Sequence, residues 1–302
     1  AGYGLISVLV SAGVLNLFHV QILEQIGINI ILAVGLNLIV GFSGQFSLGH
    51  AGFMAIGAYA AAIIGSKSPT YGAFFGAMVL GALISGAVAL FVGIPTLRLK
   101  GDYLAVATLG VSEIIRIFII NGGSLTNGAA GILGIPNFTN WQMVYLFVVI
   151  TTIATLNFLR SPIGRSTLSV REDEIAAESV GVNTTKIKII AFVFGAITAS
   201  IAGSLQAGFI GSVVPKDYTF INSIIVLIIV VFGGLGSITG AIVAAIVLGI
   251  LNMFLQDVAS VRMIIYALAL VLVMIFRPGG LLGTWELSLS RLFKKGKKEG
   301  QN

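Results

Sequence analysis

Few side chains in this 302-residue chain could take part in catalysis. There is no cysteine, and the two histidines, His19 and His50, are too few for a clustered metal site. No G-x-x-x-x-G-K-S/T run occurs, so the chain has no P-loop of its own to hold the phosphates of ATP. We therefore expect no enzyme, no bound metal and no cofactor.

The polar side chains gather around an interruption between two apolar stretches. The apolar pattern breaks at 42–49, and four polar residues lie in or beside this segment: Asn37, Gln45, Ser47 and His50. Polar side chains at a helix break can line an aqueous path through a membrane. Hydrogen bonds between helices are the alternative use of the same residues.

A second interruption repeats the first. The segments 42–48 and 232–238 share the pattern F-x-G-x-x-S-aliphatic between apolar runs, a match that chance alone can also produce. Glycine-rich interruptions at corresponding positions of two halves are typical of broken helices at a transport path. The second segment adds three candidate path residues: Gly233, Gly234 and Gly236.

Two opposite charges stand inside the apolar stretch 103–120. Glu113 and Arg116 are three residues apart and can share one face of a helix. Each charge costs about 2.5 to 3.5 kcal/mol near the centre of a span. The two costs together nearly cancel the free energy gained by inserting the apolar residues of this stretch. We expect an ion pair held among neighbouring helices, and contact with a transported solute is the alternative.

Composition indicates the kind of fold that positions these residues. Hydrophobic residues make up 57% of the chain and charged residues 9%, with a mean hydropathy of +1.06, whereas soluble domains carry about 25% charged residues. This excludes a water-soluble fold. We predict an all-α integral membrane protein, a bundle of about ten transmembrane helices with broken helices and a short cytoplasmic helix. The spans are predicted near 2–18, 22–41, 48–64, 72–94, 103–120, 141–159, 188–208, 220–235, 238–256 and 262–276.

Charge asymmetry predicts the orientation. Of the 17 basic and 11 acidic residues, nine lie in 160–188 and six in 291–299, and the positive-inside bias puts both segments in the cytoplasm. The uncharged segment 121–140 is then external, and both termini are cytoplasmic. We expect a transmembrane domain at 1–283 and a basic tail at 284–302. The tail suits anionic lipid, and it lacks the interleaved aromatic residues of a nucleic-acid site.

The cytoplasmic segment 160–188 contains a predicted helix over 170–180. Ser169 and Glu172 match a capping box, and Gly181 supplies a left-handed end. Such a helix would present a small apolar face to a groove on another protein, and a solvated linker helix is the alternative. That face consists of Ile175, Ala176 and Val180.

Glycine and alanine recur at intervals of four in several spans. The pairs Gly72–Gly76 and Gly236–Gly240, and the series Gly195, Ala199 and Gly203, have the spacing that lets helix backbones approach closely. We expect them to pack inside the bundle rather than to form dimer faces.

Several segments resemble a known family. The runs 35–53 and 97–105, FGGLGS at 232–237 and FRPGGLLG at 276–283 are similar, in the right order, to the M-type permease of the leucine/isoleucine/valine ABC importers. The run 174–181, with two alanines and then a glycine four residues later, resembles the segment by which ABC importer permeases dock on their ATPases. The wider motif has glutamate where Ile175 stands, so a carboxylate contact with the ATPase falls to Glu172 or Glu174.

The resemblance implies a permease subunit of an ATP-driven importer for branched-chain amino acids in the bacterial inner membrane. The implied partners are a paralogous second permease, two cytoplasmic ABC ATPases that use the ATP, an external amino-acid-binding protein and membrane lipid. Relatives that carry urea or other small amides and acids offer an alternative within the family. The docking residues that the resemblance implies are Arg171, Glu172, Glu174, Ala176, Ala177 and Gly181.

An ion-coupled secondary transporter is the rival from another class. It would need buried carboxylates as ion sites, and only Glu24 and Glu113 qualify. A membrane enzyme is disfavoured because clustered His, Asp or Cys residues are lacking.

Overall fold

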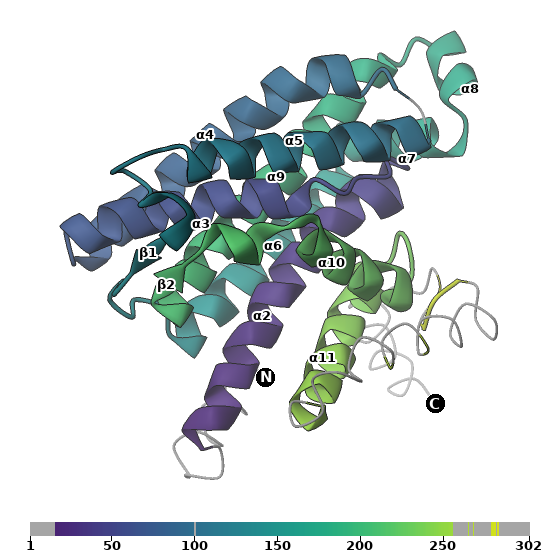
Figure 1. Ribbon diagram of the computed structural model, residues 1–302. Helices are drawn as coiled ribbons and strands as arrows, with labels where there is room; N and C mark the ends of the chain where they lie inside the picture. The colour runs from purple at the N-terminus through teal and green to yellow at the C-terminus, as the bar shows by residue number, and fades with distance from the viewer. Residues whose placement is uncertain are drawn as a thin grey trace, which may run out of the picture.

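The computed structural model describes residues 16–99, 101–255, 265, 268, 279–281 and 283. Over these residues the chain is a bundle of helices joined mostly by short loops, with one antiparallel sheet of two short strands (Figure 1). The predicted all-α class is therefore confirmed. The longer helices are α2 (Leu17–Asn37), α3 (His50–Lys67), α4 (Tyr71–Thr96), α5 (Asp102–Ile120), α6 (Trp141–Arg160), α9 (Thr184–Ile210), α10 (Phe220–Gly233) and α11 (Ile238–Phe254). The shorter elements are the π-helix η1 (Leu38–Phe42), η2 (Gly128–Ala130), β1 (Ile132–Leu133), α7 (Pro162–Glu172), α8 (Glu174–Ser179), β2 (Ser212–Val213) and η3 (Pro215–Tyr218).

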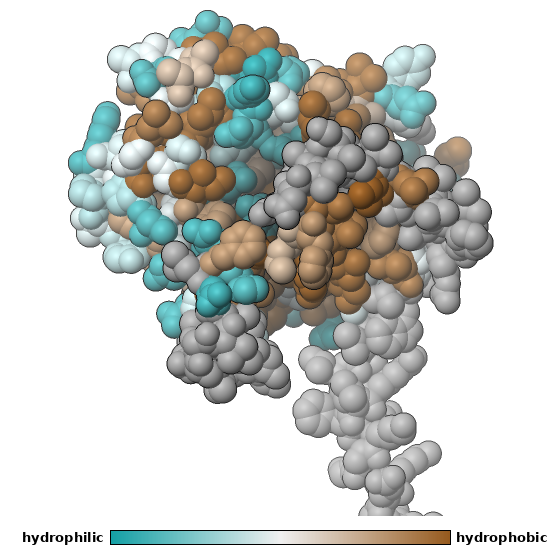
Figure 2. Space-filling view, turned by 60° about the horizontal axis from the view of Figure 1, so that its bottom comes forward, coloured by the Kyte–Doolittle hydropathy of each residue, from teal (hydrophilic) through white to brown (hydrophobic). Residues whose placement is uncertain are grey.

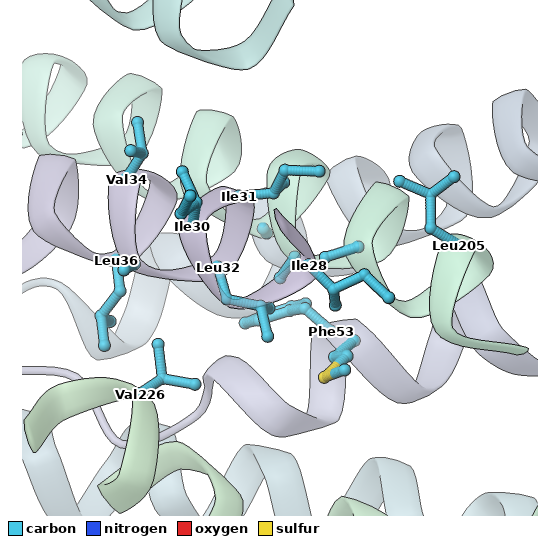
Figure 3. Close-up of a cluster of buried hydrophobic side chains, with 14 of the residues drawn as sticks. Ile28, Ile30, Ile31, Leu32, Val34, Leu36, Phe53, Leu205 and Val226 are labelled. Atoms are coloured by element: carbon cyan, nitrogen blue, oxygen red, sulfur yellow. The ribbon is translucent and has the colours of Figure 1, made fainter. Parts of the chain in front are cut away.

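Helix α2 is a large part of the core because apolar side chains cover most of its surface. A helix that is hydrophobic all round must be covered on all sides, and Ile28, Ile31 and Leu36 are fully buried. Their neighbours in the buried cluster include Phe53 of α3 and Leu205 of α9 (Figure 3). Helix α2 packs against α6, α9, α10 and α11, whereas α3 and α4 pack chiefly against α9.

Helices α3 and α9 approach each other through small residues. A Cβ atom on Gly57 would lie 1.9 Å from the backbone oxygen of Ser200, and one on Gly203 would lie 1.9 Å from the backbone oxygen of Met54. The Ser204 hydroxyl donates a hydrogen bond to the Gly57 carbonyl oxygen at 3.0 Å. The expected internal packing of Gly203 is confirmed, whereas Gly72 and Gly76 on α4 have no atom within contact distance of such a Cβ.

The predicted spans agree with the observed helices to within about five residues wherever the structure describes the chain, although α10 (predicted at 220–235) is too short to cross a membrane alone. Among the described residues, five helices are long and apolar enough to cross a membrane, and α10 with α11 adds a sixth if this pair is one span. The pair is bent by 118° at a short break, and the 14 residues of α10 rise only about 21 Å, less than a bilayer core of about 30 Å. The predicted span 2–18 and nearly all of 262–276 lie outside the described residues, so the count of ten stays a prediction.

The bundle has two different ends. Helices α7 and α8 lie at one end, and the sheet of β1 and β2 lies at the other (Figure 1). Ile132 pairs with Val213 in this sheet, which joins the segment 121–140 to the chain after α9. Large apolar side chains such as Phe91 and Leu83 of α4 are exposed on the outside, and Figure 2 shows hydrophobic side chains over much of one face. Such a surface suits lipid.

Candidate transport path and docking segment

The first interruption begins where α2 changes into the π-helix η1. The Ser43 backbone N–H donates to the Leu38 carbonyl oxygen at 3.1 Å, five residues back, and the chain then runs without helix to His50. Gly44 has a φ of +69°, which glycine adopts without strain. The sequence predicted this break at 42–49, and the structure confirms it.

The second interruption separates α10 from α11. Gly234 and Gly236 have φ angles of +119° and +84°, and a Cβ on Gly233 would lie 2.4 Å from the backbone oxygen of Gly240. Ser237 caps α11, because its hydroxyl oxygen accepts a hydrogen bond from the Gly240 N–H at 2.9 Å. Glycine is needed here both for the turn and for the close approach of the two helices.

Asn37 joins the two interruptions. Its side-chain N–H donates to the Ser237 carbonyl oxygen at 2.8 Å, and its side-chain oxygen accepts from the Gly236 N–H at 3.0 Å. Asn37 is fully buried, so these bonds satisfy backbone groups that water cannot reach. The two segments that share a sequence pattern therefore lie in contact, although about 200 residues separate them.

The other polar residues of the first interruption are also enclosed. Gln45 is 2% exposed, and its side-chain N–H groups donate to the Ser43 hydroxyl at 2.5 Å and the Lys188 carbonyl at 3.1 Å. Ser47 and His50 are 2% and 1% exposed. These side chains are shut inside the bundle in this conformation, and their role in a path stays a prediction.

The predicted single helix over 170–180 is wrong. Two helices meet at Asp173, whose carboxylate accepts hydrogen bonds from the Ile175 and Ala176 N–H groups and thus caps α8. Ser169 lies inside α7 and donates to the Ser166 carbonyl oxygen, so it is no cap. The start of α7 is set instead by Ser161, whose hydroxyl accepts from the Gly164 N–H, with proline in the first turn.

The end of α8 matches the prediction. Gly181 has a φ of +87°, its N–H donates to the Glu178 carbonyl, and the Val182 N–H donates to the Ala177 carbonyl. This pair of bonds is the Schellman motif, which needs a left-handed residue at this position. Gly181 therefore has a conformational role.

The residues expected to dock on a partner divide into exposed and buried groups. Ile175 and Val180 are 77% and 78% exposed, whereas Ala177 is 3% exposed and faces its own chain. Glu174 forms an ion pair with Lys188 at 2.5 Å, and Glu172 is largely exposed beside Arg171. The surface open to a partner thus combines apolar side chains, including Ala176, with the exposed acidic residues Glu172, Asp173 and Glu178. Ala177, also predicted as a docking residue, is not on this surface.

Arg171 links α7 to both interruptions. A Cβ on Gly236 would lie 2.7 Å from a terminal guanidinium nitrogen of Arg171, and a Cβ on Gly44 would lie 3.4 Å from Cγ of the same side chain. The Arg171 side chain therefore lies against both broken segments. The sequence placed Arg171 in the docking segment but gave no sign of this contact.

Glu113 and Arg116 form the predicted ion pair. A terminal guanidinium nitrogen of Arg116 lies 2.7 Å from a Glu113 carboxylate oxygen, and both side chains are 27% exposed. Mutual pairing reduces the cost of placing these charges on an apolar helix.

Replacing both residues of this pair with leucine is expected to preserve transport better than either single replacement. A single change leaves one charge unpaired, at a cost of about 2.5 to 3.5 kcal/mol if that charge lies deep in the membrane, whereas the double change leaves none. Uptake and inserted amount would be measured for the three variants. If the double variant inserts normally but loses transport, the pair has a role in transport itself.

Glu24, the second candidate ion site, also has a protein partner. It is 7% exposed on α2 and accepts a backbone hydrogen bond from Trp141, the first residue of α6. A carboxylate at the start of a helix is stabilised by the helix dipole. Each of the two carboxylates that an ion-coupled transporter would need therefore has a contact within the chain, Glu24 with the Trp141 backbone and Glu113 with Arg116.

A row of amide side chains on α2 was not among the predicted site residues. Gln21, Gln25 and Asn29 are spaced by four residues and so lie on one helix face. With Asn252 of α11 they line one surface groove. The four-residue spacing was the signal that could have revealed the row.

These features define a polytopic helical membrane protein with two joined helix breaks and a protruding pair of short helices. The chain belongs to the branched-chain amino acid transport system / permease component family, whose model matches residues 18–276. It is 37% identical over 262 residues to the high-affinity branched-chain amino acid transport system permease protein LivM of Salmonella typhimurium, covering 76% of this chain and 61% of that protein.

Two proteins of Escherichia coli are also similar. LivM is 37% identical over 69% of this chain and 57% of its own length, and the permease protein LivH is 27% identical over 71% and 74%. The chain thus spans about 60% of the length of these LivM proteins. No solved structure matches it.

Proposed function

We propose that this chain is the membrane-spanning permease subunit of an ATP-driven importer that moves branched-chain amino acids across the bacterial inner membrane. The observation that carries the proposal is the family match over residues 18–276 together with 37% identity to LivM. The joined interruptions and the exposed helix α8 are consistent with a subunit whose energy comes from another protein.

The proposed partners are a paralogous second permease, two cytoplasmic ABC ATPases and an external amino-acid-binding protein. LivM and LivH of Escherichia coli both match this chain and are both named as permease proteins of a branched-chain amino acid transport system. This supports pairing between two related permeases. Residues 160–188 would then face the ATPases in the cytoplasm, with 121–140 on the outside and both termini inside.

The coupling path runs, in this proposal, from α8 through α7 to the helix breaks. An ATPase that pushes on α8 would move Arg171, which touches the segments at Gly44 and Gly236. Because Asn37 joins these segments, they would move together. Asn37, Gln45, Ser47, His50 and the glycines at 233, 234 and 236 would then open onto the path.

The test is uptake by the assembled importer in vesicles. Vesicles with the permease pair, the ATPases and the binding protein should accumulate labelled leucine, isoleucine or valine only when ATP is supplied on the ATPase side. Labelled urea offered to the same vesicles tests the alternative cargo. Uptake by this chain alone, driven by an ion gradient, would instead establish the secondary-transporter reading.

A further inference from the structure

A groove between α2 and α11 differs from the larger grooves of this bundle. It has a volume of about 230 Å³ and is lined by Gln21, Gln25, Asn29 and Asn252 among apolar residues. A larger groove of about 540 Å³ over α4 is lined by apolar residues and glycine alone. Lipid tails suit the second groove, but they offer no hydrogen-bond partners to the three amide groups of α2.

The amide groups lie along the groove. Gln21, Gln25 and Asn29 extend about 12 Å along one face of α2 at 1.5 Å per residue. Gln21 is exposed, and the other amide residues of the groove are partly exposed. Gln25 donates to the Asn29 side-chain oxygen at 3.3 Å, a bond that uses only part of the hydrogen-bonding capacity of two amides.

Helix α11 forms the opposite wall. A Cβ on Gly249 would lie 2.3 Å from a side-chain carbon of Ile26, so the two helices touch at the floor of the groove. Both helices run from the region of the two interruptions toward the lower edge of Figure 1. Asn252 and Met253 therefore stand near the end of α11, opposite the N-terminal half of α2.

The groove lies far from α7 and α8. Gln21 is about 24 Å along α2 from Asn37, and Phe209, which also lines the groove, is about 38 Å along α9 from Thr184 beside α8. The groove is thus on the half of the bundle opposite the proposed ATPase side. Solute released outside the membrane would meet it before reaching the joined breaks.

We infer that this amide-lined groove binds and guides the solute on the outer half of the path, and that it suits a zwitterion with an aliphatic side chain. None of the described residues that line it is charged. Amides both donate and accept hydrogen bonds, so they can pair with an ammonium and a carboxylate at once. The aliphatic part of the solute would contact apolar neighbours such as Ile22 and Met253.

The inference rests on the proposed function and is tested by accessibility first. Single cysteines at Gln25, Asn29 and Asn252, in this chain without cysteine, should react with a membrane-impermeant thiol reagent in the assembled importer, and saturating leucine should slow the reaction. A cysteine at Phe91, which is 82% exposed on the apolar face of α4, should not react. Unreactive groove cysteines would overturn the inference.

The second arm is transport. The variant with both Gln25→Leu and Asn29→Leu, which bond each other, should lower leucine uptake at least about tenfold, the effect of losing one hydrogen bond to a charged group, at unchanged insertion. Gln142→Leu, at an exposed position in the first turn of α6, is the matched control and should leave uptake unchanged.

The outcomes separate the two proposals. If the parent importer carries leucine and the double variant does so equally fast, the groove inference fails while the proposed function stands. If the parent carries no leucine, the proposed function fails, and reactive groove cysteines would still support an aqueous path for another uncharged or zwitterionic solute.

Discussion

Replacing Gly57 with alanine is expected to prevent stable assembly of the bundle. The added Cβ would lie 1.9 Å from the Ser200 backbone oxygen, and backbone atoms cannot move aside as a flexible side chain can. Helices α3 and α9 would have to separate, with loss of the hydrogen bond from Ser204 to the Gly57 carbonyl. Overpacking costs about 1–3 kcal/mol or more, and the lost bond adds about 1 kcal/mol.

The matched control is Gly76→Ala on α4. Nothing lies within 4 Å of a Cβ at Gly76, so alanine fits, and it favours a helix over glycine by about 0.5–1 kcal/mol. Thermal unfolding and elution of the purified proteins in detergent would compare the two variants. Equal stability of Gly57→Ala and Gly76→Ala would show that the close approach of α3 and α9 is not required.

The regularly spaced small residues show what the sequence of a membrane bundle does not reveal. Gly72–Gly76 and the series that ends at Gly203 have the same spacing of small residues, yet only the series packs closely. A Cβ on Gly195 or Gly203 would lie within 3.0 Å of another helix backbone, whereas one on Gly72 or Gly76 would have no atom within 4 Å. Spacing places residues on one face of a helix but does not say which helix covers that face. The partner is decided by packing between distant segments, which no local pattern records.

Helix positions were predictable where apolar runs are long. The predicted stretch 72–94 corresponds to α4 at Tyr71–Thr96, and 188–208 to α9 at Thr184–Ile210. The docking segment was less predictable because it contains two competing helix starts. The prediction used Ser169 and Glu172, but Ser161 followed by proline is the start that the structure uses, and Asp173 begins a second helix.

In the candidate path, the positions of the interruptions were predictable from the sequence, but the contacts between them were not. Glycine located both interruptions, because turns with positive φ are costly for other residues. The hydrogen bonds of Asn37 to Gly236 and Ser237 join positions about 200 residues apart, and only the repeated pattern hinted that the two segments are related. The contact of Arg171 with both segments had no local signal.

The variant with both Ile175→Arg and Val180→Arg is expected to lose ATP-driven transport while inserting normally. Both side chains are more than three-quarters exposed, so the change disturbs no packing within the chain. If they enter an apolar groove on the ATPase, each contributes about 1.5–3 kcal/mol of burial. Losing both would weaken docking on the order of 100-fold or more, enough to separate the ATPase during purification.

Ala177 is a poorer position than Ile175 for testing whether α8 docks on an ATPase. Ala177→Arg would place a long charged side chain where Ala177 is 3% exposed, so it would displace α8 from its own chain and combine a folding defect with a docking defect. Ile175→Val is the conservative control and should retain both the ATPase and uptake. The measurements are co-purification of the ATPase, ATP hydrolysis stimulated by leucine and its binding protein, and the inserted amount of each permease variant.

A single cysteine at Ile175 would also show on which side of the membrane the segment 160–188 lies. It should react with an impermeant reagent only from the side to which ATP must be supplied, and bound ATPase should protect it. A cysteine at Leu125, which is 62% exposed in the segment 121–140, should react only from the opposite side. If the double arginine variant keeps its ATPase and transports at the parent rate, α8 is a solvated linker and energy enters the bundle elsewhere.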